Sequence, residues 1–126
     1  MKILLAEDDK KTRTLFKEIL LREGYEVIEA STGKEAIHKY ENVMQKPEII
    51  VLDHHMPQMS GLKVTEEILR RNSEVKIFIL TSDSTIDLNG FSGERITLKR
   101  KPLSCQDFLH EINKIVQTGI IGKIEQ

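Results

Sequence analysis

Short apolar runs alternate along this chain with longer segments in which apolar residues recur at helical spacing. Three of the runs are rich in Ile, Leu and Val, as expected for strands covered on both faces: residues 2–6 (KILLA), 48–52 (EIIVL) and 75–80 (VKIFIL). Two more mix apolar with charged residues, which favours positions at the edges of a sheet: residues 25–29 (YEVIE) and 95–99 (RITLK). The pattern therefore predicts three central and two edge strands.

Each predicted strand is followed by a segment that we expect to be helical. The clearest apolar stripes are Leu15, Phe16, Ile19 and Leu20; Ala36, Ile37, Tyr40, Val43 and Met44; and Phe108, Leu109, Ile112, Ile115 and Val116. Ser104, with Asp107 three residues later, resembles a capping box and indicates where the last helix starts. Residues 82–95 are rich in turn formers, so we expect only a short or frayed helix there.

Alternation of strands and helices predicts an α/β fold, a doubly wound parallel sheet with helices on both faces. With the charged strands at the edges, the expected strand order is 2-1-3-4-5, and ligands bind such sheets at the carboxyl ends of the strands. We expect one domain over residues 1–118. Residues 119–126 follow the last apolar stripe and are expected to form a tail, either a linker stub or a small docking segment.

Composition narrows the partners and the compartment. Lys and Arg total 19 and Asp and Glu total 20, for a net charge of -1, so the overall charge favours neither nucleic acid nor an anionic membrane. The single cysteine, Cys105, cannot form an internal disulfide, and no leader sequence is evident at the start. The apolar runs are far shorter than the roughly 20 residues that span a bilayer. We therefore expect a cytoplasmic protein without direct contact to nucleic acid or membrane.

Polar residues with matching chemistry follow four of the predicted strands. Glu7 and Asp8 end the first, Asp53 the third, Thr81 the fourth and Lys101 the fifth. In the expected sheet these ends converge, and three carboxylates in one pocket repel one another unless a cation is present. Oxygen ligands of this kind suit Mg²⁺ or Mn²⁺. A phosphoryl group would complete the site, with Asp53 as its acceptor.

At these positions the sequence resembles the receiver domains of two-component response regulators, over residues 1–118. The resemblance rests on Glu7 and Asp8, on Asp53 followed by Met56-Pro57 and Gly61, on Thr81-Ser82 and on Lys101-Pro102. It implies a flavodoxin-like (βα)5 fold. Pro57 and Gly61 would shape the loop after Asp53, and the Lys101-Pro102 peptide bond is commonly cis in the family.

The resemblance also implies a function. Asp53 would accept a phosphoryl group from a phosphohistidine on a sensor histidine kinase or a histidine phosphotransfer protein, and the domain would catalyse its own phosphorylation and slow dephosphorylation. Asp8, Asp53 and the main-chain carbonyl of His55 would hold the metal, with Glu7 acting through a bound water. Thr81 and Lys101 would contact the phosphoryl group. Their movement would alter the surface formed by residues 82–94, the strand 95–99 and the last helix, where an effector domain or a second copy could bind.

Two positions bear on the lifetime of the signal and on switching. By the resemblance, His55 and Asp83 line the path of the water that hydrolyses the acyl phosphate. If they pair, the lifetime should change with pH near the ordinary histidine pKa of about 6.5. Leu98 stands where many receivers carry an aromatic residue that turns inward upon phosphorylation, so this chain is expected to switch differently.

Several alternatives compete with this hypothesis. Asp9 is expected to cap the first helix and not to bind a metal. His54 and His55 are adjacent and therefore point in different directions, which makes them a poor chelating pair. A phosphohydrolase of the haloacid dehalogenase type would have a second acid two residues after its aspartate, where this chain has His55. A flavodoxin-like cofactor binder needs a phosphate loop that is not acidic. A pseudo-receiver, used only for protein contacts, would keep the fold without the chemistry.

Overall fold

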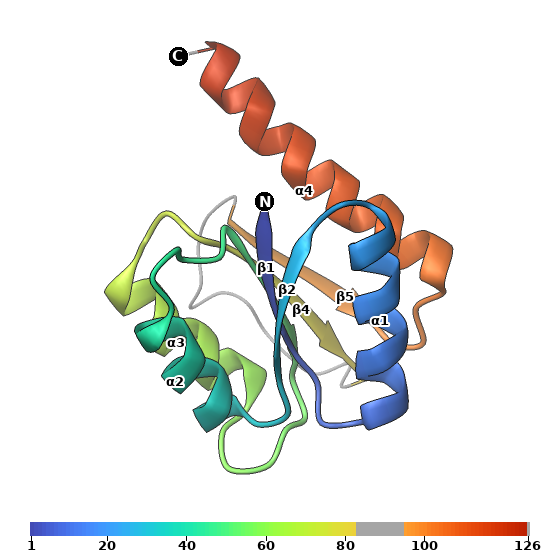
Figure 1. Cartoon of the computed structure of the whole chain (residues 1–126), viewed down its shortest axis with the longest axis vertical. Helices are drawn as coiled ribbons and strands as arrows, with labels where there is room; N and C mark the ends of the chain where they lie inside the picture. Colours follow the sequence, from blue (N-terminus) through green and yellow to red (C-terminus); the bar gives the residue numbers. More distant parts are fainter. Residues whose placement is uncertain (83–94, 126) are drawn as a thin grey trace.

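The computed structural model describes the backbone of residues 1–82 and 95–125, and the side chains of residues 1–82 and 95–117. Its five strands form one parallel sheet in the order β2-β1-β3-β4-β5, which confirms the predicted order (Figure 1). The strands are β1 (Lys2–Ala6), β2 (Glu26–Ala30), β3 (Ile49–Asp53), β4 (Lys76–Thr81) and β5 (Ile96–Arg100). The two charged strands lie at the edges, as expected.

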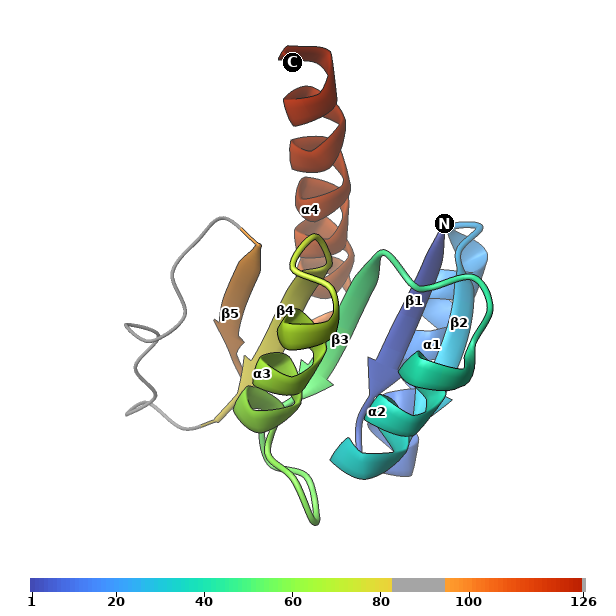
Figure 2. The ribbon, with the colours of Figure 1, turned by 90° about the vertical axis from the view of Figure 1, so that its left-hand side faces the viewer.

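Within the described residues, four helices cover the two faces of the sheet: α1 (Lys10–Arg22), α2 (Gly33–Asn42), α3 (Gly61–Arg71) and α4 (Cys105–Glu125). In Figure 2, α2 and α3 lie in front of the sheet, with α1 and α4 behind it. Alternate residues of each central strand serve the two layers, so Leu4 packs towards α2 and α3 while Leu5 packs towards α1 and α4. In the described part of the chain, no helix combines the length and apolar character needed to cross a bilayer.

Capping residues start α1 and α4 a few residues beyond the strands that precede them. Asp9 caps α1 by accepting a hydrogen bond from the amide of Thr12 at 3.0 Å, so the predicted role of Asp9 is confirmed. Ser104 likewise accepts from the amide of Asp107 at 3.0 Å at the start of α4. The loop between β1 and α1 is therefore short, which keeps Glu7 and Asp8 close to the carboxyl end of β1.

Some expectations from the apolar pattern are wrong. Met44 is 98% exposed, because α2 ends at Asn42 and Lys46 donates to the carbonyls of the last turn instead. Leu15 lies on the outer side of α1 and is exposed. The division at residue 118 stays a prediction, and the backbone of α4 continues as a helix to Glu125. The helix expected within residues 82–95 lies mostly outside the described residues.

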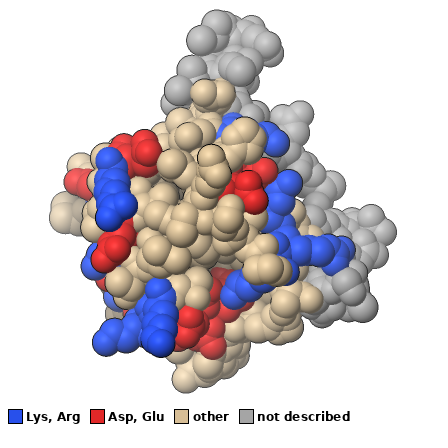
Figure 3. All heavy atoms as spheres, turned by 90° about the vertical axis from the view of Figure 1, so that its right-hand side faces the viewer, with Lys and Arg blue, Asp and Glu red and all other residues tan. Residues whose placement is uncertain are grey.

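The layer of α1 and α4 has no extended area of one charge among the residues coloured in Figure 3. Acidic and basic side chains lie beside each other around an uncharged centre. This arrangement agrees with the near-zero net charge of the chain. On this face, a nucleic-acid surface of the usual strongly basic kind is not formed by the described residues.

Candidate functional site

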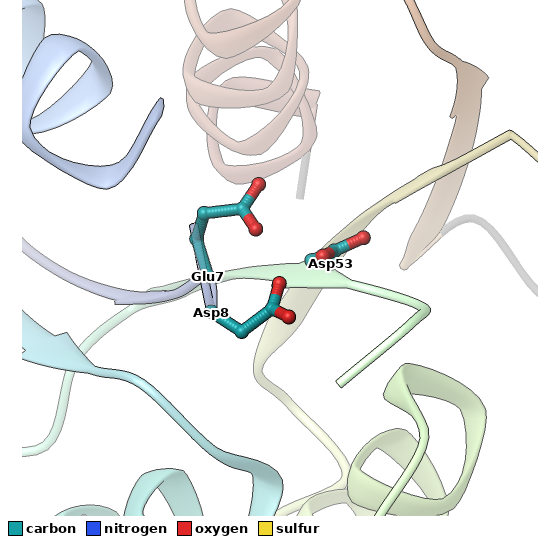
Figure 4. A group of neighbouring side chains, drawn as sticks. All are labelled: Glu7, Asp8 and Asp53. Carbon is teal, nitrogen blue, oxygen red and sulfur yellow. The ribbon is translucent and has the colours of Figure 1, made fainter. Parts of the chain in front are cut away.

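Three carboxyl groups meet at the carboxyl ends of β1 and β3. Glu7 and Asp8 directly follow β1 and Asp53 is the last residue of β3, and one oxygen from each lies within 4.8 Å of the others (Figure 4). Glu7 and Asp53 are buried, with 2% and 4% of each residue's surface exposed, whereas Asp8 is exposed. Among the described residues, this is the one group of three or more acidic, histidine or cysteine side chains close enough to share an ion.

Lys101 supplies a positive charge to this group from beyond the end of β5. Its Nζ donates to Oε1 of Glu7 at 3.2 Å and lies 3.1 Å from Oδ1 of Asp53. Burial lowers the pKa of the Lys101 ammonium, but the hydrogen bond to Asp53 and the two carboxylate charges outweigh it, so this pKa lies above its usual value. The peptide bond between Lys101 and Pro102 is cis, as predicted.

Glu7 holds its proton more tightly than an ordinary glutamic acid. Burial, followed by the hydrogen bond and charge of Asp53, raises its pKa from 4.5 to about 7, although the amide of Asp9 donates to Oε2 at 3.2 Å and opposes the shift. When all are ionised, the three neighbouring carboxyl groups also carry more charge than the one ammonium of Lys101 compensates. The excess negative charge fits a divalent cation, and the oxygen donors match those that Mg²⁺ prefers.

The raised pKa of Glu7 predicts a pH-dependent loss of stability. Between pH 4.5 and about 7 the folded state keeps the Glu7 proton while the unfolded chain releases it, so the free energy of unfolding falls as pH rises. The loss should reach at most about 3 kcal/mol above pH 7. The free energies of unfolding of wild type and Glu7→Gln would be measured in urea at pH 5 and pH 8 without divalent ions. Because the two proteins have all other carboxyl groups in common, the difference between them reports the contribution of Glu7. A wild-type-to-variant difference that does not change with pH would contradict the prediction.

The loop after β3 is folded tightly against Asp53. The amide of His55 donates to Oδ1 of Asp53 at 3.3 Å, and the amide of Gly61 donates to the carbonyl of His54 at 2.9 Å. A Cβ on Gly61 would lie 2.9 Å from the carbonyl oxygen of Asp53, so only glycine allows this approach. Pro57 accepts from the amide of Met59 within the same loop. The missing side chain of Gly61 thus lets the start of α3 lie against the end of β3.

Of the other predicted site residues, Thr81 and Leu98 are described and Asp83 is not. Thr81 is fully buried as the last residue of β4, and its carbonyl accepts from the Lys101 amide at 2.8 Å. Leu98 in β5 is half-buried against the α2 and α3 layer. Asp83 lies outside the described residues, so its pairing with His55 stays a prediction. The rings of His54 and His55 lie edge to face, with 4.9 Å between their centroids, an arrangement that does not direct two ring nitrogens at one ion.

One contact at the site was not expected from the sequence. Arg13, on the first turn and a half of α1, donates from Nη1 to the main-chain carbonyl of Glu7 at 2.8 Å. Its Nε lies 3.5 Å from a carboxylate oxygen of Glu29 in β2. In the sequence, only the six-residue spacing between Glu7 and Arg13 could have predicted this contact. That spacing is informative only once α1 is known to start at Lys10.

Comparison with known proteins agrees with this arrangement. The family described as "Response regulator receiver domain" matches residues 3–91. The chemotaxis protein CheY of Thermotoga maritima is 34% identical over 82 residues, which cover 64% of this chain and 67% of that protein. The alkaline phosphatase synthesis transcriptional regulatory protein PhoP of Bacillus subtilis is 38% identical over 81 residues, but these span only 33% of its length.

Solved structures show the same fold. A CheY-like receiver domain protein from Methanospirillum hungatei superimposes with a TM-score of 0.82 at 28% identity, covering 93% of this chain and 94% of that one. The response regulator TrrA from Thermotoga maritima, in complex with Mg²⁺-BeF, gives a TM-score of 0.74 at 31% identity and covers 90% of this chain and 97% of its own. The chain belongs to the receiver domains of two-component response regulators.

Proposed function

We propose that this domain is the phosphoacceptor of a two-component phosphorelay and that Asp53 is the residue phosphorylated. The donor would be a phosphohistidine on a sensor histidine kinase or a histidine phosphotransfer protein. The observation that carries the proposal is the position of the buried Asp53 carboxylate, 3.1 Å from the Lys101 ammonium and within 4.8 Å of the Glu7 and Asp8 carboxylates. Such a site combines a nucleophile, a fixed cation and an excess of oxygen ligands.

In the proposed transfer, a carboxylate oxygen of Asp53 forms a bond to phosphorus as the bond from phosphorus to the histidine nitrogen breaks. The imidazole leaves with that electron pair, and Asp53 becomes an acyl phosphate. Lys101 offsets the charge on a phosphoryl oxygen, and the Thr81 hydroxyl donates to another. Most of the rate comes from positioning and charge compensation, as is usual in phosphoryl transfer.

The metal would be held by Asp8, Asp53 and the main-chain carbonyl of His55, with Glu7 contacting it through a water. Bound there, Mg²⁺ or Mn²⁺ would compensate the negative charge that develops on the phosphoryl oxygens. The cluster of carboxyl oxygens supports this assignment, as does the raised pKa of Glu7, which comes first from burial and then from the hydrogen bond and charge of Asp53. TrrA, which shares 31% of its residues with this chain, was crystallised with Mg²⁺-BeF.

The output surface would be formed by β5 and α4 together with residues 82–94, of which the structure describes Ser82. Thr81 and Lys101 connect this surface to the site, because Thr81 accepts a hydrogen bond from Lys101 and pairs with Arg100 in the sheet. With Leu98 in place of an aromatic residue, switching would depend on Thr81. An effector domain or a second copy would bind there, in the cytoplasm. Residues 1–118 would form the receiver and 119–126 its extension.

Incubation of the wild-type protein with Mg²⁺ and acetyl phosphate, followed by intact-mass measurement, tests the proposal. We expect one phosphoryl adduct per chain, located on Asp53 by peptide mapping and absent when a chelator removes the metal. Phosphotransfer from a histidine phosphotransfer protein would then establish the class of donor. A chain that takes no adduct from either donor would instead be a pseudo-receiver, and continuous turnover of phosphate esters would point to the phosphohydrolase.

A further inference from the structure

Arg13 contacts the loop that carries two of the three acidic residues. Its guanidinium donates from Nη1 to the carbonyl oxygen of Glu7 at 2.8 Å, and that carbonyl belongs to the peptide group joining Glu7 to Asp8. Only 17% of the Arg13 side chain is exposed. The orientation of this peptide group decides where the Asp8 carboxylate points, because Asp8 follows it directly.

Two further contacts fix the guanidinium itself. Nε of Arg13 lies 3.5 Å from Oε1 of Glu29 on β2, and the other oxygen of Glu29 accepts from Lys17 at 2.8 Å. The backbone of Glu7 is tied to the same strand, since its amide donates to the carbonyl of Ala30 at 3.0 Å. Arg13 therefore joins α1, the β1 end and β2 at one point, where a planar group with several donors can hold two acceptors at once.

We infer that Arg13 is a positioning residue for the metal site. Resting on the proposed function, the inference is that Arg13 fixes the Glu7–Asp8 peptide so that both carboxylates face Asp53 before any ion binds. Groups that orient metal ligands commonly change metal affinity by about 10- to 100-fold when they are removed. Arg13 does not itself contact the three carboxylate groups in the described interactions.

Removing Arg13 has two effects on Mg²⁺ binding, and they have opposite signs: lost positioning weakens binding, whereas the lost positive charge strengthens it. Loss of a positive charge near the site would by itself favour binding of a cation. Because Glu29 pairs with Arg13, it already compensates part of the Arg13 charge, and removing that charge changes the attraction for Mg²⁺ only a little. The change would in any case strengthen Mg²⁺ binding, not weaken it. Weaker binding of Mg²⁺ in a variant without the guanidinium would therefore indicate lost geometry.

The test compares Mg²⁺ dissociation constants, measured by calorimetry, for wild type, Arg13→Met, Arg13→Lys and Lys17→Met. We expect Arg13→Met to bind Mg²⁺ about 10-fold more weakly. Arg13→Lys should recover part of this loss, because an ammonium can still donate to the Glu7 carbonyl. Lys17→Met is the matched control, since Lys17 is the other cation on this helix that pairs with Glu29 and, in the described interactions, it does not contact Glu7. Its affinity should stay within about twofold of wild type.

A second readout is independent of the metal. In the ion-free protein, the amide resonance of Asp8 should shift in Arg13→Met and not in Lys17→Met. Unchanged or tighter Mg²⁺ binding by Arg13→Met would overturn the inference; if that variant does not fold, the same result in Arg13→Leu, which likewise cannot donate to the Glu7 carbonyl, would do so. A wild-type protein that binds no Mg²⁺ would instead refute the proposed metal site, and the Asp8 resonance would still decide whether Arg13 orders the loop.

Discussion

Asp53→Asn should abolish the phosphoryl adduct and leave a folded domain. The amide side chain has nearly the same shape but lacks the nucleophilic carboxylate oxygen, so no acyl phosphate can form. Asparagine can still accept from Lys101 and from the His55 amide, which now contact Oδ1 of Asp53. Without Mg²⁺, removal of one of three neighbouring carboxylates should raise the free energy of unfolding by about 1 kcal/mol at pH 8. Intact mass and urea unfolding measure the two effects.

Asp9→Asn is the matched control for this experiment. Asp9 belongs to the neighbouring loop but caps α1 through the amide of Thr12, and asparagine caps helices about as well as aspartate. The control should therefore take the adduct at the wild-type rate and unfold at a similar urea concentration. An adduct of wild-type yield in Asp53→Asn would show that another residue is the acceptor.

The fold could be predicted because each strand carries its own signal. Central strands must be apolar on both faces, and this alone separated β1, β3 and β4 from the edge strands. The later four strands nevertheless begin and end one residue beyond the predicted positions. In β3, β4 and β5 the hydrogen-bond ladder includes a polar residue at the carboxyl end, Asp53, Thr81 or Arg100, which the apolar pattern cannot mark. The polar site thus begins inside the sheet.

Helix limits were harder to predict, because spacing records which residues share a face but not where hydrogen bonding ends. Met44 continues the stripe of Tyr40, yet α2 ends at Asn42, where Val43 takes an extended backbone. Conversely, the last apolar stripe stops at Val116, whereas α4 continues through Gly119 and Gly122 to Glu125. Glycine lowers helix propensity by roughly 1 kcal/mol but does not forbid a helix.

The acidic cluster was predictable for a topological reason, and its supporting contacts were not. Parallel strands bring their carboxyl ends to one edge, so Glu7, Asp8 and Asp53 had to converge once the strand order was known. The contact of Arg13 depends on the strand register and on where α1 starts. One partner is a main-chain oxygen and the other lies on β2, so residue identities alone do not reveal it.

Lys101→Ala is expected to slow phosphorylation by about 10²- to 10³-fold, the usual cost of removing one fixed charge or donor from a reaction site. Lys101 is the cation between Glu7 and Asp53, at 3.2 and 3.1 Å, and among the described residues no other side-chain cation pairs with these two carboxylates. Breaking such a partly buried pair should also lower the free energy of unfolding without Mg²⁺ by about 1–3 kcal/mol. Saturating Mg²⁺ should restore much of this stability, because the ion replaces the missing charge.

The neighbouring strand position separates this role from a general loss of positive charge. Lys99, two residues earlier, pairs with Glu111 of α4 at 3.3 Å. Lys99→Ala removes the same charge from the same segment, so it should leave the phosphorylation rate within about threefold of wild type. The rates would be compared by intact mass over time at fixed acetyl phosphate and saturating Mg²⁺. Equal slowing in both variants would indicate a diffuse electrostatic effect, and a wild-type rate in Lys101→Ala would exclude a direct role in the transfer. The position of Lys101 between two buried carboxylates favours a large and specific effect, because a charge in such a site is compensated only by its immediate neighbours.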